Sequence, residues 1–261
     1  MVRPAVTAAI IARDEASHLG HCLAALAWAD ERLVILDERT IDRSAEIAEE
    51  SGARLVRQPF RSFPAQRNFA LGRVTTPWIL FVDADERVTS ALAEEIGRVV
   101  TCDSADRPVG YWIPRRNYIW GGWIRHGGWF PDRQLRLMKV DAARYDEQRD
   151  VHELVVLAGE SGILSESLIH YNYDRIGQFI DKQRQYSTLD AKRLARAGQR
   201  AKPRNFVLQP TRELRRRLVQ LEGHKDGWRG FALASLLAFY TGVTYAKLVR
   251  ESLEGSVESP P

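Results

Sequence analysis

The sequence predicts an α/β fold in which a mainly parallel sheet carries helices on both faces, followed by a C-terminal helical appendage. Three observations support this prediction. Short apolar runs alternate with amphipathic segments over the first hundred residues, as in doubly covered sheets. Three of the four apolar runs end in acidic residues. Beyond residue 174 the chain is helical in period and strongly basic.

The four expected strands are short apolar runs bounded by turn or charged residues. They cover residues 6–12, 32–37, 53–56 and 78–82. The expected helices between and after them cover about 18–28, 42–50, 64–73 and the stretch from 90, and three of them follow a Ser or Thr that can cap a first turn. The 44% hydrophobic content suffices for a core, so global disorder is excluded.

Acidic residues follow three of these strands. Right-handed crossovers bring the carboxyl ends of parallel strands to one edge, where ligands of open α/β sheets bind. The acids Asp14, Glu15, Asp37, Asp83 and Asp85 should therefore converge there. Because alternate strand residues share a side, Asp83 and Asp85 should project together. Two such anions need a counter-charge, and a divalent cation that carries a diphosphate commonly supplies it.

The second half of the predicted α/β region contains further strands, at about 109–114, 134–139 and 163–173. Between the first two lies a segment rich in Gly and Trp, residues 120–130. Aromatic faces beside flexible glycines suit a pocket wall that stacks on a sugar ring. A loop anchored by buried tryptophans explains the same composition equally well, and both interpretations stay open.

The C-terminal region is basic. Residues 175–229 hold fifteen Lys and Arg against five Asp and Glu, which favours an anionic partner. The apolar stretch 231–243 is shorter than the ~20 residues that span a bilayer. With its cationic flanks it predicts a helix lying on an anionic membrane surface, the alternative being a helix packed against the rest of the chain. Residues 255–261 should be disordered.

Two cysteines without metal or redox spacing, Cys22 and Cys102, favour two buried thiols in a reducing, cytoplasmic setting. The first five residues carry no signal-peptide pattern. Nucleic acid is not expected as a partner, because an acid-lined sheet edge repels phosphates that lack a metal.

Several motifs, weak singly, recur together in a known order. They include Asp14-Glu15 after the first strand, Gln66-Arg67-Asn68, Asp83-Ala84-Asp85, His152-Glu153, His170-Tyr171 and residues 226–231. In these motifs nearly the whole chain resembles family-2 glycosyltransferases of the Rossmann-like GT-A fold, and more narrowly the bacterial lipopolysaccharide-core β-glucosyltransferases. Two features depart from the family pattern. Asp14 stands where Asn is usual, and the charged loop 38–41 replaces a small Ser/Gly-rich one.

The resemblance implies a catalytic domain over residues 1–173, with a nucleotide-sugar half (1–107) and an acceptor half (108–173). A basic helical region, 174–254, follows it. The implied reaction is metal-assisted, inverting transfer from a nucleoside-diphosphate sugar, a UDP-sugar in the first place. The implied acceptor is a glycan or a lipid-linked molecule of cell-envelope or lipopolysaccharide synthesis. The enzyme would be cytoplasmic and peripheral at the inner face of the plasma membrane.

The resemblance also implies roles for individual residues. The nucleotide would be bound by Ala12, Asp14, Glu15, Asp37, Arg67, Asp83 and Ala84. Mg²⁺ or Mn²⁺ would be held by Asp85 and His152. The base that takes the acceptor proton would be Glu153, with Asp132 second, and the acceptor-sugar pocket would include Trp123, Trp129 and Arg136.

Two other functions stay open at this stage. A catalytically impaired nucleotide-sugar-binding protein is compatible with the altered loop 38–41. A phosphotransferase that uses Asp-x-Asp as nucleophile and acid is less favoured, because that class wants Thr or Val where Arg87 stands.

Overall fold

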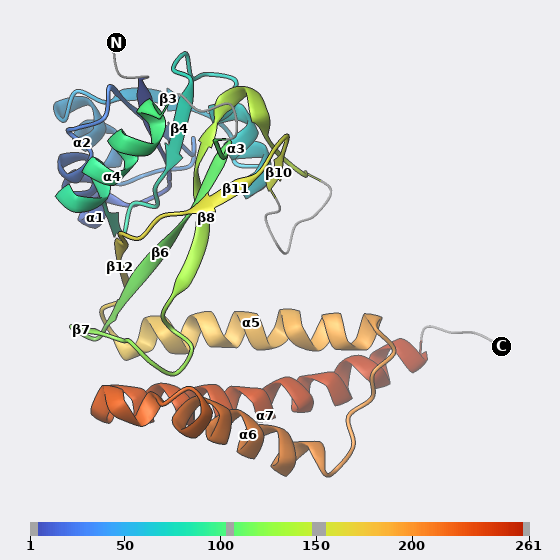
Figure 1. Ribbon diagram of the computed structural model, residues 1–261. Helices are drawn as coiled ribbons and strands as arrows, with labels where there is room; N and C mark the ends of the chain where they lie inside the picture. Colours follow the sequence, from blue (N-terminus) through green and yellow to red (C-terminus); the bar gives the residue numbers. More distant parts are fainter. Residues whose placement is uncertain (1–4, 103–106, 148–154, 258–261) are drawn as a thin grey trace. The chain divides into compact units, whose positions relative to one another are not determined.

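The computed structural model describes residues 5–102, 107–147 and 155–257, with side chains up to residue 252. The chain forms two compact units (Figure 1). Unit 1 comprises Met1–Arg115 and Asp132–His170, and unit 2 comprises Arg116–Pro131 and Tyr171–Pro261. The sequence predicted one domain boundary, at residue 173. The structure differs from that prediction in that residues 116–131 belong to the same unit as the C-terminal helices.

Unit 1 is built on four parallel strands. They are β1 (Val6–Ala12), β2 (Glu31–Leu36), β3 (Arg54–Arg57) and β4 (Trp78–Phe81), in the spatial order β3-β2-β1-β4. Within the register, Ile10 of β1 pairs with Val34 of β2, and Ala8 pairs with Leu80 of β4. The expected α/β fold is confirmed, since the order reverses direction at β1 as in other open sheets.

Helices cover both faces of these strands. The helices α1 (Ala16–Ala25), α2 (Ser44–Glu50) and α4 (Ser90–Thr101) pack on the face that carries Ile10 and Leu80. On the other face, α3 (Phe63–Leu71) packs against Ala9 and Ile79. Alternate residues of one strand thus enter different cores, which is why these strands are apolar throughout.

Antiparallel strands extend the sheet beyond β4. Next to β4 lies β8 (Asp132–Lys139), then β6 (Gly110–Ile119), β12 (Leu168–Tyr173) and the short β5 (Glu86–Arg87). The strand β11 (Ser161–Ile163) pairs with β6, while β9 (Ala143–Tyr145) and β10 (Val155–Leu157) form a separate pair, preceded by a 3₁₀ turn, η1 (Val140–Ala142). Both β6 and β12 begin in unit 1 and end in unit 2.

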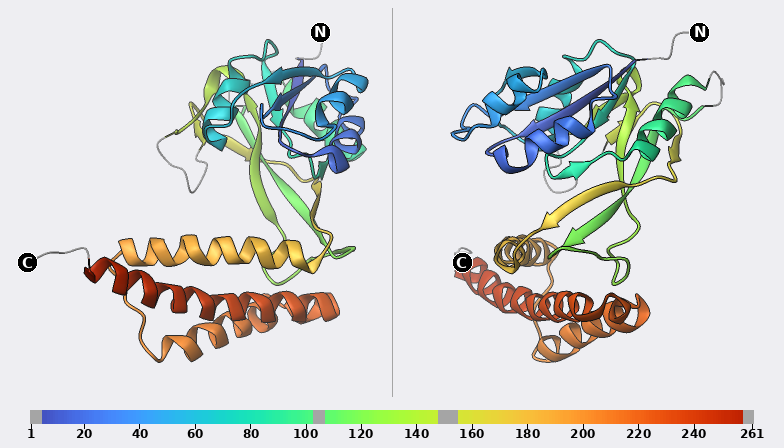
Figure 2. Two further views of the ribbon diagram at one scale, coloured as in Figure 1. Left: turned by 180° about the vertical axis from the view of Figure 1, so that it is seen from behind. Right: turned by 90° about the vertical axis from the view of Figure 1, so that its left-hand side faces the viewer.

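Unit 2 joins three helices to a hairpin. The helices are α5 (Ile176–Arg196), α6 (Asn205–Arg215), which continues as a π-helical turn η2 (Arg216–Gln220), and α7 (Gly227–Val257), which follows a 3₁₀ turn η3 (Gly223–Asp226). The three helices lie side by side in both views of Figure 2. The strand β7 (Gly122–Trp123) pairs with the end of β6. A small core of Ile119, Ile124, Tyr173, Phe179 and Leu233 fastens this hairpin to the helices.

The helix α6 accommodates Pro210 in its interior. Three expectations from the sequence need correction. The tail expected to be disordered from residue 255 is helical up to Val257. Cys22 is buried as expected, whereas Cys102 is exposed. Within the described chain, Gly223–Ser252 is long and apolar enough to cross a membrane by length and composition, although the stretch 231–243 alone looked too short.

Candidate active site

The two aspartates after β4 lie in a turn rather than on the strand. The strand ends at Phe81, and the turn is closed by a hydrogen bond of 2.9 Å from Glu86 N to Asp83 O. The Glu86 carboxylate in turn accepts the backbone N–H of Asp83 at 2.9 Å. The strand alternation that predicted a shared side for Asp83 and Asp85 does not apply here, and the two carboxylates have different partners.

Asp83 is neutralised by arginines from distant segments. Arg136 on β8 donates from Nη1 to Asp83 Oδ1 at 3.2 Å and from Nη2 to Oδ2, and Arg67 Nη2 lies 3.8 Å from Oδ1. Burial would raise the pKa of Asp83, but the charges of Arg136 and Arg67 outweigh it and hold that pKa well below its usual range. Asp83 is therefore a stable anion with its charge compensated by protein.

Arg136 has a different place from the one expected for it. Its side chain is 4% exposed and donates to Asp83 and also, at 3.0 Å, to Glu86 Oε1. Burial lowers the pKa of Arg136, yet the two carboxylates raise it further than burial lowers it. The guanidinium therefore holds the turn together from within unit 1 through its two Nη groups, while its buried Nε has no hydrogen-bond partner within the described residues.

The ion pairs continue as a chain of alternating charges. The fully buried Glu86 also accepts from Arg115 Nη1 at 3.2 Å. Arg115 then donates to Asp132 Oδ2 from Nε and Nη2, at 2.9 and 2.6 Å. These ion pairs form a chain of side chains that links β5, β6 and β8 at the acidic turn. Each charge in it contacts an opposite one, in the order Asp83, Arg136, Glu86, Arg115 and Asp132.

Asp85 turns to a histidine. His170 Nε2 on β12 lies 3.3 Å from Asp85 Oδ2, with side-chain exposures of 9% and 31%. No role was predicted for His170 from the sequence. The signal that pointed to it was its presence in the family motif His170-Tyr171. The expected metal ligand His152 and the expected base Glu153 lie outside the described residues. Within the described residues, no group of three or more His, Cys, Asp or Glu that could hold a metal is present.

Glu15 belongs to the same acidic edge. It precedes α1, its backbone N–H donates to Ser44 Oγ at 2.9 Å, and its side chain is partly buried. Burial, followed by the negative charges of Asp85 and Asp83, raises the pKa of Glu15 to about 7. The carboxylates of Glu15, Asp83 and Asp85, which follow different strands, are thus close enough to act on one another.

Asp14 explains one departure from the family pattern. Its backbone is left-handed, with φ of 53°, a conformation that Asn and Asp tolerate better than other residues that carry a Cβ. Its Oδ1 accepts the backbone N–H of Ile41 at 2.9 Å. The side-chain oxygen of an asparagine has the same position and accepting ability. Asp14 therefore preserves the structural role while it adds a charge.

The altered loop 38–41 acts on Asp37. Arg39 donates to the Asp37 carboxylate through its backbone N–H and through Nε and Nη2, at 3.1, 3.1 and 2.7 Å. These hydrogen bonds lower the pKa of Asp37 to about 2. The Asp37 side chain is 3% exposed, whereas that of Arg39 is 57% exposed. A residue expected to hold the nucleoside is therefore capped by a solvent-facing arginine.

The helix α3 positions Arg67 toward the acidic turn. On either side of it, Gln66 Nε2 donates to the backbone of Pro59 at 3.1 Å, and Asn68 Nδ2 donates to Tyr145 O at 3.0 Å. The guanidinium of Arg67 lies over the rings of Phe81 and Tyr145, 5.5 and 5.3 Å from their centroids. In the motif Gln66-Arg67-Asn68, the two amide side chains thus anchor α3, and the arginine between them lies toward Asp83.

The two remaining nucleotide candidates contribute backbone atoms. Ala12 ends β1, is 3% exposed, and its carbonyl accepts the N–H of Asp37 at 3.0 Å. Ala84 lies in the acidic turn, is 4% exposed, and its carbonyl accepts from Arg87 Nη1 at 2.7 Å. Small side chains at both positions leave room at the acidic edge.

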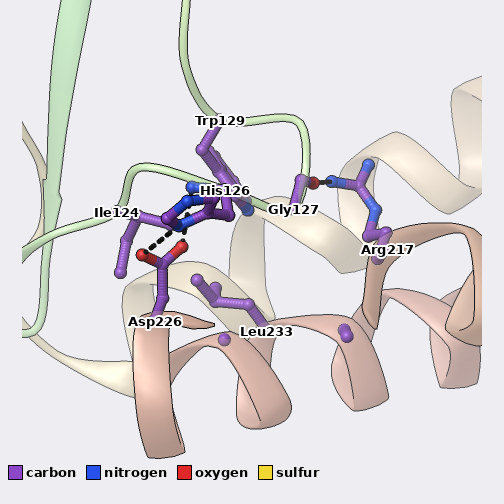
Figure 3. A pocket seen from close by; sticks show the side chains of 9 residues that line it. Ile124, His126, Gly127, Trp129, Arg217, Asp226 and Leu233 are labelled. Carbon is purple, nitrogen blue, oxygen red and sulfur yellow. Dashed lines mark hydrogen bonds and ion pairs between the residues drawn. The ribbon is translucent and has the colours of Figure 1, made fainter. Parts of the chain in front are cut away.

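Of the three expected pocket residues, Trp123 and Trp129 belong to unit 2 and Arg136 belongs to unit 1. Trp129 borders a small pocket together with His126, Asp226 and Arg217 (Figure 3). There Asp226 Oδ1 lies 3.0 Å from His126 Nδ1, and Arg217 donates to the carbonyl of Gly127 at 2.7 Å. These contacts hold the loop after Trp123 against the start of α7.

Comparison with known proteins identifies the family of the chain. The model of the family described as glycosyl transferase family 2 matches residues 7–152, more than half of the chain. The chain belongs to glycosyl transferase family 2. This glycosyltransferase therefore has the GT-A arrangement expected from its sequence, and the Asp-x-Asp phosphotransferase alternative is excluded.

Relatives extend the similarity to the whole glycosyltransferase. It is 30% identical over 254 residues to the lipopolysaccharide core biosynthesis glycosyltransferase LpsC of Rhizobium meliloti, a match that covers 93% of this chain and 91% of LpsC. An uncharacterized glycosyltransferase of Rickettsia felis is 26% identical over 95% of this chain and 90% of its own. Among solved structures, S. aureus TarS with UDP-GlcNAc has a TM-score of 0.49 and 11% identity, covering 97% of this chain and 92% of TarS.

Proposed function

We propose that this family-2 glycosyltransferase moves a sugar, with inversion, from a nucleoside-diphosphate sugar to a glycan or lipid-linked acceptor. A UDP-sugar is the donor proposed first, and cell-envelope polysaccharide or lipopolysaccharide synthesis is the proposed setting. The likeness to LpsC over nearly the whole chain supports this setting. The observation that carries the proposal is the division of the acidic turn, in which Asp83 is matched by arginine while Asp85 lies beside His170.

The acidic edge has the donor set for a divalent cation. Asp85 offers carboxylate oxygen and His170 offers imidazole nitrogen, a mixed set that suits Mn²⁺ better than the oxygen-preferring Mg²⁺. The pKa of Glu15 is raised, first by burial and then by the negative charges of Asp85 and Asp83, which supports a cation at this edge. A bound cation would compensate this negative charge and the charge that develops on the leaving diphosphate. His152 is kept as a further proposed ligand.

The nucleoside is proposed to bind along the ends of β1 and β2. Carboxylates suit ribose hydroxyls and base N–H groups, which are donors. Glu15, Asp14 and Asp37 supply these acceptors, and Ala12 and Ala84 leave space beside them. Arg67 supplies positive charge near the diphosphate, because its guanidinium already faces Asp83.

The base that takes the acceptor proton is proposed to be Glu153. The alternative, Asp132, has both carboxylate oxygens engaged. Its Oδ2 accepts from Arg115, and its Oδ1 accepts from Gln134 Nε2 at 2.9 Å. A base must offer a lone pair to the attacking hydroxyl, so these hydrogen bonds favour Glu153 over Asp132.

The helix α7 is proposed to rest on an anionic membrane surface at the cytoplasmic side. One face is buried in unit 2 through Leu233, Ala234 and Leu248, and Lys247 Nζ donates to Ser187 Oγ of α5 at 2.8 Å. Such packing favours a helix at the surface over one that spans the bilayer. The opposite face exposes Trp228 and Phe231 among many cationic residues, which suits the interface of acidic lipids.

A thermal-shift screen of UDP, UDP-glucose, UDP-GlcNAc and GDP-mannose, each with Mn²⁺ or with EDTA, tests the donor and the metal together. At one hundred times its Kd, a ligand stabilises the folded state by about 2.7 kcal/mol. We expect a UDP-sugar to raise Tm only when Mn²⁺ is present, and Asp85→Asn to abolish this rise. Equal stabilisation in EDTA, or an unchanged response of Asp85→Asn, would contradict the proposal.

A further inference from the structure

Two arginines of unit 2 lie over one tryptophan. The guanidinium carbons of Arg116 and Arg125 are 5.0 and 4.2 Å from the ring centroid of Trp123. Arg116 comes from β6, Trp123 from β7, and Arg125 from the loop that follows. The three side chains thus gather two positive charges and one large apolar face on a single hairpin.

These two charges have no acidic partner. Among the described residues, no carboxylate oxygen lies within 4 Å of either guanidinium. Other cations of the same unit do have such partners. Arg217 Nε bonds Glu213 Oε1, and Lys225 Nζ is 2.6 Å from Glu222 Oε1. The hairpin therefore presents two positive charges without an ion pair among the described residues, in a unit whose residues 175–229 already hold fifteen Lys and Arg against five Asp and Glu.

Donors on this hairpin also lack acceptors. Arg116 Nε and the indole N–H groups of Trp123 and Trp120 are buried and have no hydrogen-bond partner within the described chain. A buried donor without an acceptor costs about 1–3 kcal/mol, so natural proteins retain few of them. Several on one short hairpin, beside two unmatched cations, point to a ligand that brings oxygen acceptors and negative charge.

The hairpin is held rigidly enough to be a site. Trp123 pairs with Tyr118 across the two strands, and Phe130 packs its edge on the Trp123 ring with centroids 5.7 Å apart. The backbone N–H of Arg125 donates to Asp226 Oδ1 at 3.1 Å. At Gly122 the Arg229 side chain packs closely, since a Cβ added there would lie 2.8 Å from its guanidinium. The arrangement exists before any ligand binds, which lowers the entropic cost of binding.

We propose that Arg116, Trp123 and Arg125 form a subsite for an acidic saccharide, a sugar bearing a phosphate or a carboxylate group. Guanidinium groups bind such anions through paired N–H donors, and the Trp123 ring lies against both guanidinium groups and holds them close together. This inference rests on the proposed function, since it identifies the acceptor as an anionic glycan. The anion-binding chemistry would also suit the phosphate of a lipid headgroup, which the experiment must distinguish.

Titration of the full-length protein with glucose 6-phosphate, glucuronate and glucose, followed by ¹⁵N NMR of the indole N–H groups, tests the subsite. The Trp123 resonance is the one that disappears in Trp123→Phe. We expect glucose 6-phosphate and glucuronate to shift it, and glucose to bind at least tenfold more weakly. The double variant Arg116→Gln/Arg125→Gln should lose at least tenfold in affinity for both acidic sugars.

The matched control is Arg184→Gln/Arg193→Gln on α5, which removes the same charge from two exposed arginines that pair with Asp181 and Asp190. It should bind glucose 6-phosphate like the native protein. If the Arg116 substitution disturbs folding, Arg125→Gln alone suffices, because Arg125 is exposed, and it should weaken binding at least threefold. Equal binding of glucose and glucose 6-phosphate, or equal losses in the test and control variants, would overturn the subsite.

Two further measurements are needed. One distinguishes a lipid phosphate from an acidic sugar as the bound anion, and the other distinguishes failure of the subsite from failure of the proposed donor. Flotation with phosphatidylcholine vesicles, with and without phosphatidylglycerol, should give the same result for the native protein and Arg116→Gln/Arg125→Gln. Loss of vesicle binding with unchanged sugar-phosphate binding would assign the anion to lipid and overturn the subsite. The Mn²⁺-dependent shift by UDP-sugar should persist in this variant. Failure of that shift in the native protein, with phosphosugar binding intact, would reject the donor proposal alone.

Discussion

His170 Nε2 lies 3.3 Å from Asp85 Oδ2, although the two residues are 85 positions apart in the sequence. The pairing of β12 with β5 creates this contact, because it sets His170 opposite Glu86, the residue that follows Asp85. The carboxylate proposed as metal ligand thus has an imidazole as neighbour, whereas its companion Asp83 has guanidinium groups. The two aspartates of one short motif consequently differ in what they can bind.

His170→Gln should weaken Mn²⁺-dependent binding of UDP by about 10- to 100-fold, since the imidazole nitrogen is removed from the proposed metal site. Isothermal titration with UDP in Mn²⁺ and in EDTA measures this change. His21→Gln on the exposed side of α1 is the matched control and should bind like the native protein. Native-like manganese dependence of His170→Gln would exclude the histidine from the site.

Arg136→Met should lower the free energy of unfolding by about 3–5 kcal/mol, because it leaves the buried Glu86 and the Asp83 carboxylate with an uncompensated charge. Urea denaturation at pH 7 measures this loss. Arg193→Met, at an exposed position of α5, should change stability by less than about 0.5 kcal/mol. Comparable effects of the two substitutions would mean that the buried charges are compensated in another way.

Glu15→Gln should change how stability depends on pH. The native pKa of about 7 exceeds the ordinary 4.5, so the folded protein retains a proton that the unfolded chain loses between these values. The contribution of Glu15 to stability is therefore complete below pH 4.5 and is lost as the pH rises through 7. We expect Glu15→Gln to be more stable than the native protein at pH 8, by on the order of 1 kcal/mol after solvent screening, and similar to it at pH 4.

Tm values of both proteins from pH 4 to pH 8 test this prediction, with Glu50→Gln on an exposed position of α2 as control. Addition of Mn²⁺ at pH 8 should reduce the difference, because a cation offsets the same charge repulsion. If Glu15→Gln loses as much Tm between pH 4 and pH 8 as the native protein does, another group causes the pH dependence.

Arg39→Ala should strengthen UDP binding about tenfold if the nucleoside uses Asp37, because the guanidinium now occupies the carboxylate oxygens that a ribose or base donor needs. Titration calorimetry in Mn²⁺ measures the change. Arg43→Ala, which removes an exposed arginine paired with Glu46, controls for the altered net charge. Weaker binding by Arg39→Ala would instead make Arg39 itself a ligand-contacting residue.

Phe231→Ser combined with Phe239→Ser should reduce flotation with vesicles that contain phosphatidylglycerol by at least fivefold, since these side chains, 51% and 64% exposed, supply the apolar contact proposed for α7. Ile163→Ser, which removes an exposed apolar side chain from unit 1, is the matched control. Unchanged flotation of the α7 variant would rule out this face as the membrane contact.

The nucleotide-side fold was predictable from sequence because its determinants are local. Runs such as β4 are buried on both faces and hence apolar throughout, and the caps of α3 and α4 are the expected Ser62 and Thr89, which accept from Ala65 N and Leu92 N at 3.3 and 3.2 Å. Each of these features is encoded within about ten residues.

The arrangement of the site was less predictable because it depends on distant partners. Asp83 and Asp85 differ through Arg136 and His170, which no local pattern connects to the turn. The same holds for residues 116–131, whose core contacts come from α5 and α7.

The chain passes between its two units at residues 115, 131 and 170, and this has a consequence for its synthesis. Ile119 and Ile124 leave the ribosome long before Leu233, the α7 side chain with which they share a core. Unit 1 has all of its residues once position 170 has emerged, whereas the hairpin, complete at residue 131, must wait about a hundred residues for Leu233. During translation the hairpin's apolar side chains therefore stay uncovered on a nascent chain whose first unit can already fold, the interval in which chaperone binding would matter most.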